Sequence, residues 1–273
     1  MRVVHALFLR VLVVLGLILG LSSGACMRKA GPRLKVAVTL FPIYDLARTV
    51  AGPDADVVLL VPPGLSVEDA SALPRGADAM SGVGLGIMVG LGLDEWMKTL
   101  LEQRAPSAHR LIVGDRVPTI PIRQGAGDAP PAPDPHVWLD PERAMLMSKA
   151  IAEEMARMDP THAVAYRRRS FALQQDLDAL DREIDARIGT WASRSFAFFD
   201  PAFAYYADRY HLEIHAGAAA APQEVPPVVL DPLGGQAETD TYDKLIRFDT
   251  NALERLAKSP VPRIEDASAS PSR

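Results

Sequence analysis

Short aliphatic segments alternate with helical segments along the first half of the chain, and no other feature restricts its possible folds as strongly. Strands are predicted at 34–40, 56–61, 85–91 and 110–113. Helical patterns lie between them, for example at 43–50. Strands that alternate with helices in this way indicate a parallel α/β sheet.

Two helices are predicted after the Gly- and Pro-rich loop 124–133. The first covers 141–158, and the second follows Asp159 and Pro160, which suit the N-cap and the first helical position. Apolar residues three, four or seven positions apart give the second helix a single apolar stripe, made of Tyr166, Leu173, Leu177, Leu180, Ile184 and Ile188. At about 1.5 Å per residue this helix extends roughly 40 Å, enough to run along two lobes. An ordinary amphipathic core helix would show the same pattern.

The rest of the chain predicts a smaller second α/β region. Strands are expected at 195–199 and 228–230, and helices at 201–210 and 242–256. The predicted parts are a signal peptide (1–25), a tether (26–33), an N-terminal lobe (34–140), a helical region with the bridging helix (141–190), a reduced C-terminal lobe (191–258) and a disordered tail (259–273).

The N-terminus has the features of a secretory signal peptide. Arg2 and Arg10 provide positive charge, and the apolar run at 11–21 is too short for a membrane span. Cys26 follows small residues and resembles the lipidated cysteine of a bacterial lipoprotein, although Ser23 stands where Leu is usual. Lipidation would anchor the chain to a bacterial membrane, in the periplasm or at the cell surface. Ordinary cleavage near Ala25 is the alternative.

Composition removes several classes of protein from consideration. A single cysteine excludes a disulfide framework. The chain has 34 acidic and 29 basic residues and no basic cluster, so nucleic acid is not an expected partner. We expect a monomer.

One short segment points to metal chemistry. Residues 134–140 (Asp-Pro-His-Val-Trp-Leu-Asp) present His136 between a proline-fixed turn and an apolar run, and an imidazole in such a loop suits a metal ligand. Three carboxylates, Glu68, Asp200 and Asp231, also lie beyond predicted strands. Ligands of parallel sheets collect at the carboxyl ends of strands. Spacing alone does not single these carboxylates out.

The segments that carry these four residues resemble the solute-binding proteins of zinc and manganese ABC importers. The similarity lies in four motifs of that family: LVPPGxSPHD at 60–69, DPHxWLDP from 134, HPAFGYFAKRY at 200–210 and LDPLGG at 230–235. The resemblance implies an α/β fold with two parallel-sheet lobes bridged by a long rigid helix. It also implies a divalent transition-metal cargo (manganese, iron or zinc), a permease of an ABC transporter as partner, and no enzymatic activity.

The chain departs from the family pattern in two ways. His is usual where this chain has Glu68 and Asp200, whereas His136 and Asp231 match the pattern. The implied set of one imidazole and three carboxylates suits manganese or ferrous iron better than zinc. In addition, only fifteen residues separate His215 from Asp231, which predicts a C-terminal lobe without the family's extra helix–strand unit.

Each candidate ligand also has a structural alternative. Glu68 can be a solvated loop acid, His136 can pack beside Trp138, and Asp200 and Asp231 can cap helices or turns. His211 and His215 are weaker candidates, expected at the surface or in the core.

Three functions follow from these readings. The first is a tethered receptor that captures a metal ion for an importer. The second is a family member without metal binding that acts as a lipoprotein scaffold or adhesin. The third is a metal-dependent hydrolase, which no GxSxG or HExxH motif supports. The glycines between 82 and 92 do not form a nucleotide-binding motif, so a sheet-packing or loop role is expected for them.

Overall fold

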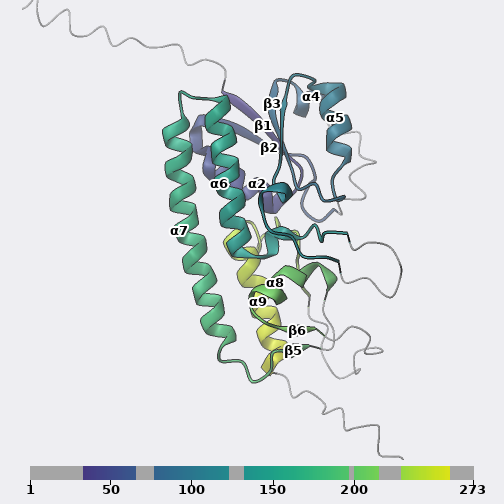
Figure 1. Ribbon diagram of the computed structural model, residues 1–273, viewed down its shortest axis with the longest axis vertical. Helices are drawn as coiled ribbons and strands as arrows, with labels where there is room; N and C mark the ends of the chain where they lie inside the picture. The colour runs from purple at the N-terminus through teal and green to yellow at the C-terminus, as the bar shows by residue number, and fades with distance from the viewer. Residues whose placement is uncertain (1–32, 66–76, 123–131, 197–199, 215–228, 259–273) are drawn as a thin grey trace, which may run out of the picture. The chain divides into compact units, whose positions relative to one another are not determined.

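The computed structural model describes residues 33–65, 77–122, 132–196, 200–214 and 229–258 (Figure 1). The predictions for the signal peptide, Cys26, Glu68, His215 and the tail 259–273 lie outside these residues. Within the described part of the chain, no helix is both long and apolar enough to cross a membrane.

A four-stranded parallel sheet organises the first half of the chain, as predicted. Its strands β1 (Leu34–Val38), β2 (Ala55–Leu59), β3 (Val83–Met88) and β4 (His109–Ile112) lie in the order β2-β1-β3-β4. The inner strands β1 and β3 bury most of their residues on both faces, which explains their largely apolar sequences.

Helices connect these strands. The helix α2 (Phe41–Ala51) follows β1, α4 (Ala77–Met80) precedes β3, and α5 (Trp96–Arg104) joins β3 to β4. Gly86 of β3 lets α5 approach closely, since a Cβ atom there would lie 2.6 Å from Leu101 Cδ1. This contact supports the sheet-packing role that the sequence predicts for these glycines.

Two long helices cover this sheet. The helices α6 (Pro141–Met158) and α7 (Ala163–Ile188) pack against each other and against α2 (Figure 1). The predicted stripe of α7 is confirmed, because all six residues are buried or half-buried. At its C-terminal half α7 also contacts α9 (Tyr242–Lys258), so one helix joins the sheet region to the end of the chain.

The predicted start of α7 is wrong. Asp159 does not cap α7, which begins later, after His162. Asp159 instead ends α6, and its Oδ2 accepts hydrogen bonds from His162 Nδ1 at 2.6 Å and from the Tyr166 hydroxyl at 2.8 Å. These side-chain donors engage the carboxylate that the prediction assigned to backbone N–H groups.

In the described residues, the C-terminal region has a second, two-stranded sheet. It contains the parallel pair β5 (Ser195–Phe196) and β6 (Glu213–Ile214), the helix α8 (Ala204–Arg209) and α9. The strand predicted at 228–230 is not formed at residues 229–230, and Val229 is exposed. The next backbone N–H, that of Asp231, donates to the side chain of Asp249 and not to a neighbouring strand.

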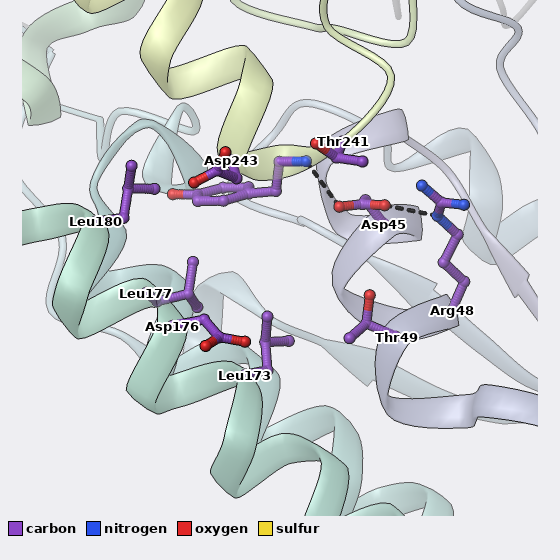
Figure 2. Close-up of a pocket in the computed structure, with 10 residues that line it drawn as sticks. Asp45, Arg48, Thr49, Leu173, Asp176, Leu177, Leu180, Thr241 and Asp243 are labelled. Carbon is purple, nitrogen blue, oxygen red and sulfur yellow. Dashed lines mark hydrogen bonds and ion pairs between the residues drawn. The ribbon is translucent and has the colours of Figure 1, made fainter.

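The start of α9 is fixed on α2 by Asp45. The buried carboxylate of Asp45 accepts a hydrogen bond from Tyr242 N at 2.7 Å and pairs with Arg48 Nε at 2.6 Å. Asp45 lines a pocket of about 580 Å³ between α2, α7 and the beginning of α9, whose lining side chains are drawn in Figure 2. Both oxygens of this buried acid therefore have partners.

Candidate metal centre

The imidazole of His136 is oriented by the carboxylate of Asp134. Asp134 Oδ1 lies 2.8 Å from both the backbone nitrogen and the ring Nδ1 of His136. Asp134 is buried, whereas the side chain of His136 is 29% exposed. Because a carboxylate accepts hydrogen bonds, Nδ1 is the donor, and in the neutral ring this tautomer leaves the lone pair on Nε2, which is how proteins orient metal-binding histidines. The sequence reasoning missed Asp134, although it lies within the motif.

Trp138 connects the His136 loop to the Asp231 segment. The indole is fully buried with its ring centroid 5.3 Å from that of His136, so His136 does pack beside Trp138. Trp138 Nε1 donates to Pro232 O at 2.7 Å. Two segments almost a hundred residues apart are therefore in direct contact.

Asp231 organises a tight turn. Its Oδ1 accepts hydrogen bonds from Leu233 N at 3.2 Å and Gly234 N at 2.8 Å, and its Oδ2 accepts one from Thr239 Oγ1 at 2.8 Å. Asp231 therefore has the turn contacts that its structural alternative describes. A carboxylate has about four lone-pair sites, so these three bonds do not exhaust its capacity to accept.

The Asp231 turn lies at the carboxyl ends of β1 and β2. Gly235 has a φ of +85°, and a Cβ atom there would lie 2.7 Å from Pro63 Cγ and 3.0 Å from Phe41 Cδ2. Phe41 follows β1, and Pro63 follows β2 in the segment that leads toward Glu68. The position agrees with the location expected for ligands of a parallel sheet.

Asp200 caps a short helix. The side chain is exposed, and Oδ1 accepts a hydrogen bond from Ala202 N at 2.9 Å at the start of the 3-10 turn Pro201–Phe203. His211 is also exposed, in the left-handed region with a φ of +54°, as expected for a surface residue.

Asp249 on α9 is a buried acid that the sequence reasoning missed. Its Oδ1 accepts the hydrogen bond from Asp231 N at 2.8 Å, while Oδ2 is buried and has no hydrogen-bond partner among the described residues. Burial raises the pKa of Asp249 from 3.8 to about 8, and the negative charges of Asp231 and Asp200 contribute. The charges of Asp200 and Asp231 therefore act on the same carboxyl group.

The described side chains do not form a closed cage. Among the residues that the structure describes, no three His, Cys, Asp or Glu side chains are arranged to hold a metal ion. The structure brings the loops of His136 and Asp231 into contact and places Asp200 within electrostatic range of Asp249. Glu68 lies outside the described residues.

The parallel sheet, the long helix and the loops that meet at the strand ends define a solute-binding protein fold of the two-lobe α/β type. The chain belongs to the family described as zinc-uptake complex component A, periplasmic, whose sequence model matches residues 36–228.

The names of the curated relatives mention different metals. The iron-binding protein YfeA of Yersinia pestis is 28% identical over 209 residues, 72% of this chain and 65% of the relative. The manganese-binding lipoprotein MntA of Halalkalibacterium halodurans is 26% identical over 66% of this chain and 59% of the relative. A high-affinity zinc uptake protein ZnuA of Brucella abortus is 30% identical over 34% of this chain and 28% of the relative. The chain therefore spans less than two thirds of the length of these relatives.

Solved structures share the fold. The laminin-binding protein Lmb of Streptococcus agalactiae superposes with a TM-score of 0.69 at 17% identity, over 83% of this chain and all of that one. A crystal structure of ZnuA gives a TM-score of 0.61 at 23% identity, over 67% of this chain and 70% of the other.

Proposed function

We propose that this chain is an extracytoplasmic solute-binding protein that captures a divalent transition-metal ion and passes it to the permease of an ABC importer. The observation that carries this proposal is the His136 imidazole, whose Nδ1 is held by the buried Asp134 so that Nε2 is available as a metal ligand. Membership of the family and the contact between the His136 and Asp231 loops support it.

The proposed ligands are Glu68, His136, Asp200 and Asp231. A set of three carboxylates and one imidazole favours manganese or ferrous iron more than an imidazole-rich site does. Zinc can also bind carboxylate and imidazole ligands. Binding of a cation would also relieve the repulsion between Asp231, Asp200 and the adjacent Asp249. The role is capture and release, so no catalytic step is assigned.

The same proposal covers the arrangement of the chain. Lipidation at Cys26 would tether a monomer to the membrane, in the periplasm or at the cell surface. The helical region 141–190 would hold the N-terminal lobe, 34–140, and the reduced C-terminal lobe, 191–258, at a nearly fixed separation. Release would then need small movements of the loops and not a large hinge motion.

A pair of histidine variants tests the proposal. Both His136 and His162 hold an Asp carboxylate through Nδ1, at 2.8 and 2.6 Å, but His162 lies at the start of α7. In isothermal titration with manganese, ferrous iron and zinc, we expect the wild-type chain to bind at least one metal. His136→Ala should abolish metal-dependent thermal stabilisation, and His162→Ala should retain it.

Two outcomes would contradict the proposal. Absence of binding heat for all three metals, in protein shown to be folded, would favour the scaffold or adhesin hypothesis. Equal loss of metal response in the two histidine variants would remove His136 from the ligand set.

A further inference from the structure

The helix α8 connects the Asp200 segment to the His136 loop. Asp200 leads directly into the 3-10 turn Pro201–Phe203 and then α8. The fully buried Tyr205 of α8 donates its hydroxyl hydrogen to Asp134 O at 2.8 Å, and the hydroxyl oxygen of Tyr205 accepts a hydrogen bond from Ile120 N at 3.2 Å. Asp134 is the residue whose side chain orients His136.

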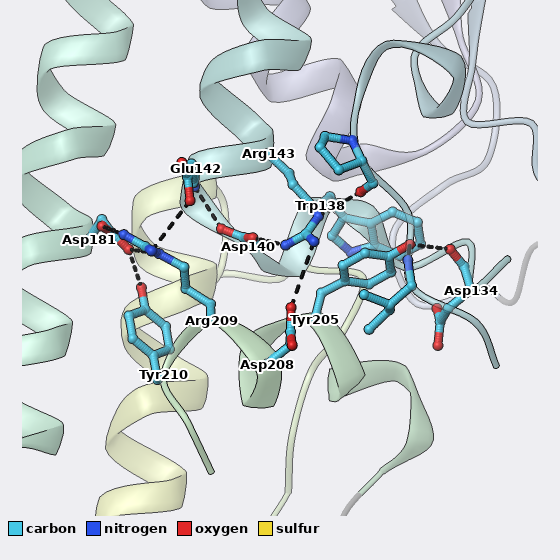
Figure 3. A network of polar contacts seen from close by, with 12 residues as sticks. Asp134, Trp138, Asp140, Glu142, Arg143, Asp181, Tyr205, Asp208, Arg209 and Tyr210 are labelled. Carbon is cyan, nitrogen blue, oxygen red and sulfur yellow. Dashed lines mark hydrogen bonds and ion pairs between the residues drawn. The ribbon is translucent and has the colours of Figure 1, made fainter. Parts of the chain in front are cut away.

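Arg143 strengthens this connection. Its guanidinium lies 4.6 Å from the centre of the Tyr205 ring, pairs with the buried Asp140, and donates to Pro118 O at 2.8 Å (Figure 3). Its Nη2 is also 3.7 Å from Asp208 Oδ2 on α8. The Arg143 guanidinium therefore contacts both α8 and the N-terminus of α6.

The other end of α8 is fixed to α7. Arg209 Nε donates to Asp181 Oδ1 at 2.9 Å, and the Tyr210 hydroxyl donates to the same oxygen at 3.0 Å. Arg209 Nη1 lies 3.3 Å from Glu142 Oε2. With both ends held, α8 cannot shift without disturbing either the long helix or the His136 loop.

We propose that Tyr205 is a positioning residue for the metal site, which holds the His136 loop at a fixed distance from the Asp200 segment and thereby slows release of the cargo. The inference rests on the proposed function. Tyr205 fixes the backbone carbonyl of Asp134, and the Asp134 carboxylate fixes the ring of His136. A movement at Tyr205 is thus transmitted to Nε2 of His136 through a single residue.

The chain offers a matched control on the same helix. Tyr206 is also fully buried, and its hydroxyl bonds to Thr250 Oγ1 of α9 at 2.8 Å, away from the His136 loop. Tyr205→Phe and Tyr206→Phe each remove one phenol oxygen from the same helix. A general loss of stability should therefore appear in both variants, whereas a change in the metal site should appear only in Tyr205→Phe.

The experiment measures the release of manganese to a chelator by stopped flow, together with the visible spectrum of bound cobalt. Tyr205→Phe should release manganese about 10-fold faster than the wild type and alter the cobalt spectrum. A change of this size is typical when a group that supports a metal ligand through hydrogen bonds is removed. Tyr206→Phe should stay within about twofold of the wild type and leave the spectrum unchanged. Arg143→Lys, which loses the planar contact with Tyr205, should shift release in the same direction and decides the question if Tyr205→Phe does not fold.

The outcomes separate the two proposals. A wild-type chain that binds no metal overturns both. A wild-type chain that binds metal, with equal release rates and spectra in Tyr205→Phe and Tyr206→Phe, overturns only the role of Tyr205.

Discussion

Replacing Asp249 with Asn should stabilise the metal-free protein. Asp249 is buried on α9, and its Oδ2 has no hydrogen-bond partner in the part of the chain that the structure describes. Burial and the charges of Asp231 and Asp200 all oppose ionisation of this carboxyl. Asn keeps the oxygen that accepts the hydrogen bond from Asp231 N, but it carries no charge.

The size of the effect follows from the raised pKa of Asp249. The pKa rises from 3.8 to about 8 in the folded chain. Each unit corresponds to about 1.36 kcal/mol, so ionising this group in the folded state costs at most roughly 5 to 6 kcal/mol. Relaxation around the site reduces this limit, and we expect a gain of about 2 to 4 kcal/mol for Asp249→Asn at pH 8.

The sign of the pH dependence is fixed by the direction of the shift. Between pH 4 and 8 the folded chain holds a proton on Asp249 that the unfolded chain has released. The free energy of unfolding therefore falls as the pH rises through this window, and the loss is complete above the pKa of about 8. Asp249→Asn should remove this contribution, so that the two proteins are similar near pH 4 and diverge toward pH 8.

Chemical denaturation in the presence of a chelator measures this difference at several pH values. Asp45→Asn is the control, because Asp45 is also buried but both of its oxygens are bonded, to Arg48 Nε and Tyr242 N. That variant should lose about 1 to 3 kcal/mol. Equal pH slopes for the wild type and Asp249→Asn, or no gain at pH 8, would refute the reasoning.

Three further predictions concern the site and its supports. Asp134→Asn should weaken manganese binding about 10- to 100-fold in calorimetry, because the ring of His136 loses the carboxylate that orients it; unchanged affinity would show that this contact is not used. Gly235→Ala should lower the free energy of unfolding by about 1 to 3 kcal/mol in urea denaturation, since its φ is +85° and Pro63 leaves no room for a Cβ atom; Gly82→Ala, with a φ of +72° and open space, should cost less, and equal losses would contradict the role of Pro63. Addition of manganese at about 100 times its dissociation constant should stabilise the wild-type chain by about 2.7 kcal/mol, and chelation should reverse the rise in melting temperature; a melting temperature independent of metal would count against binding.

The fold of the first half was predictable because parallel strands are buried on both faces. Their largely apolar segments at 34–38 and 83–88 stand out without any tertiary information. The apolar stripe of α7 was also predictable, because burial of one helix face produces a 3.6-residue period in the sequence.

The errors share a different cause. Asp159 was assigned to backbone donors but bonds to His162 and Tyr166. Residues 229–230 looked like a strand, yet the following N–H bonds to Asp249. In both places the hydrogen-bond partner is a side chain where the prediction expected a backbone group. Such side-chain partners are set by tertiary structure.

The site was predictable only in its outline. His136 and Asp231 lie in recognisable motifs, but the family pattern does not reveal that Asp249 supports Asp231. A signal was present in the sequence, because Asp249 falls on the apolar face of α9 together with Leu245, Ile246 and Leu253. An ionisable residue on a buried face requires a partner or a function, so this pattern marks Asp249 as a candidate site residue.

The cost of Asp249 has a consequence for metal binding. At and above pH 8, where Asp249 ionises, this buried acid beside Asp231 and Asp200 lowers the stability of the chain when no cation offsets the three charges. A divalent ion held by Asp231 and Asp200 would reverse the sign of the local potential at Asp249. The wild-type chain should therefore gain more stability from manganese than Asp249→Asn does, although the variant is the more stable protein in chelator. The two measurements together distinguish an acid that acts on the cargo from one that merely weakens the fold, because the second would give equal gains.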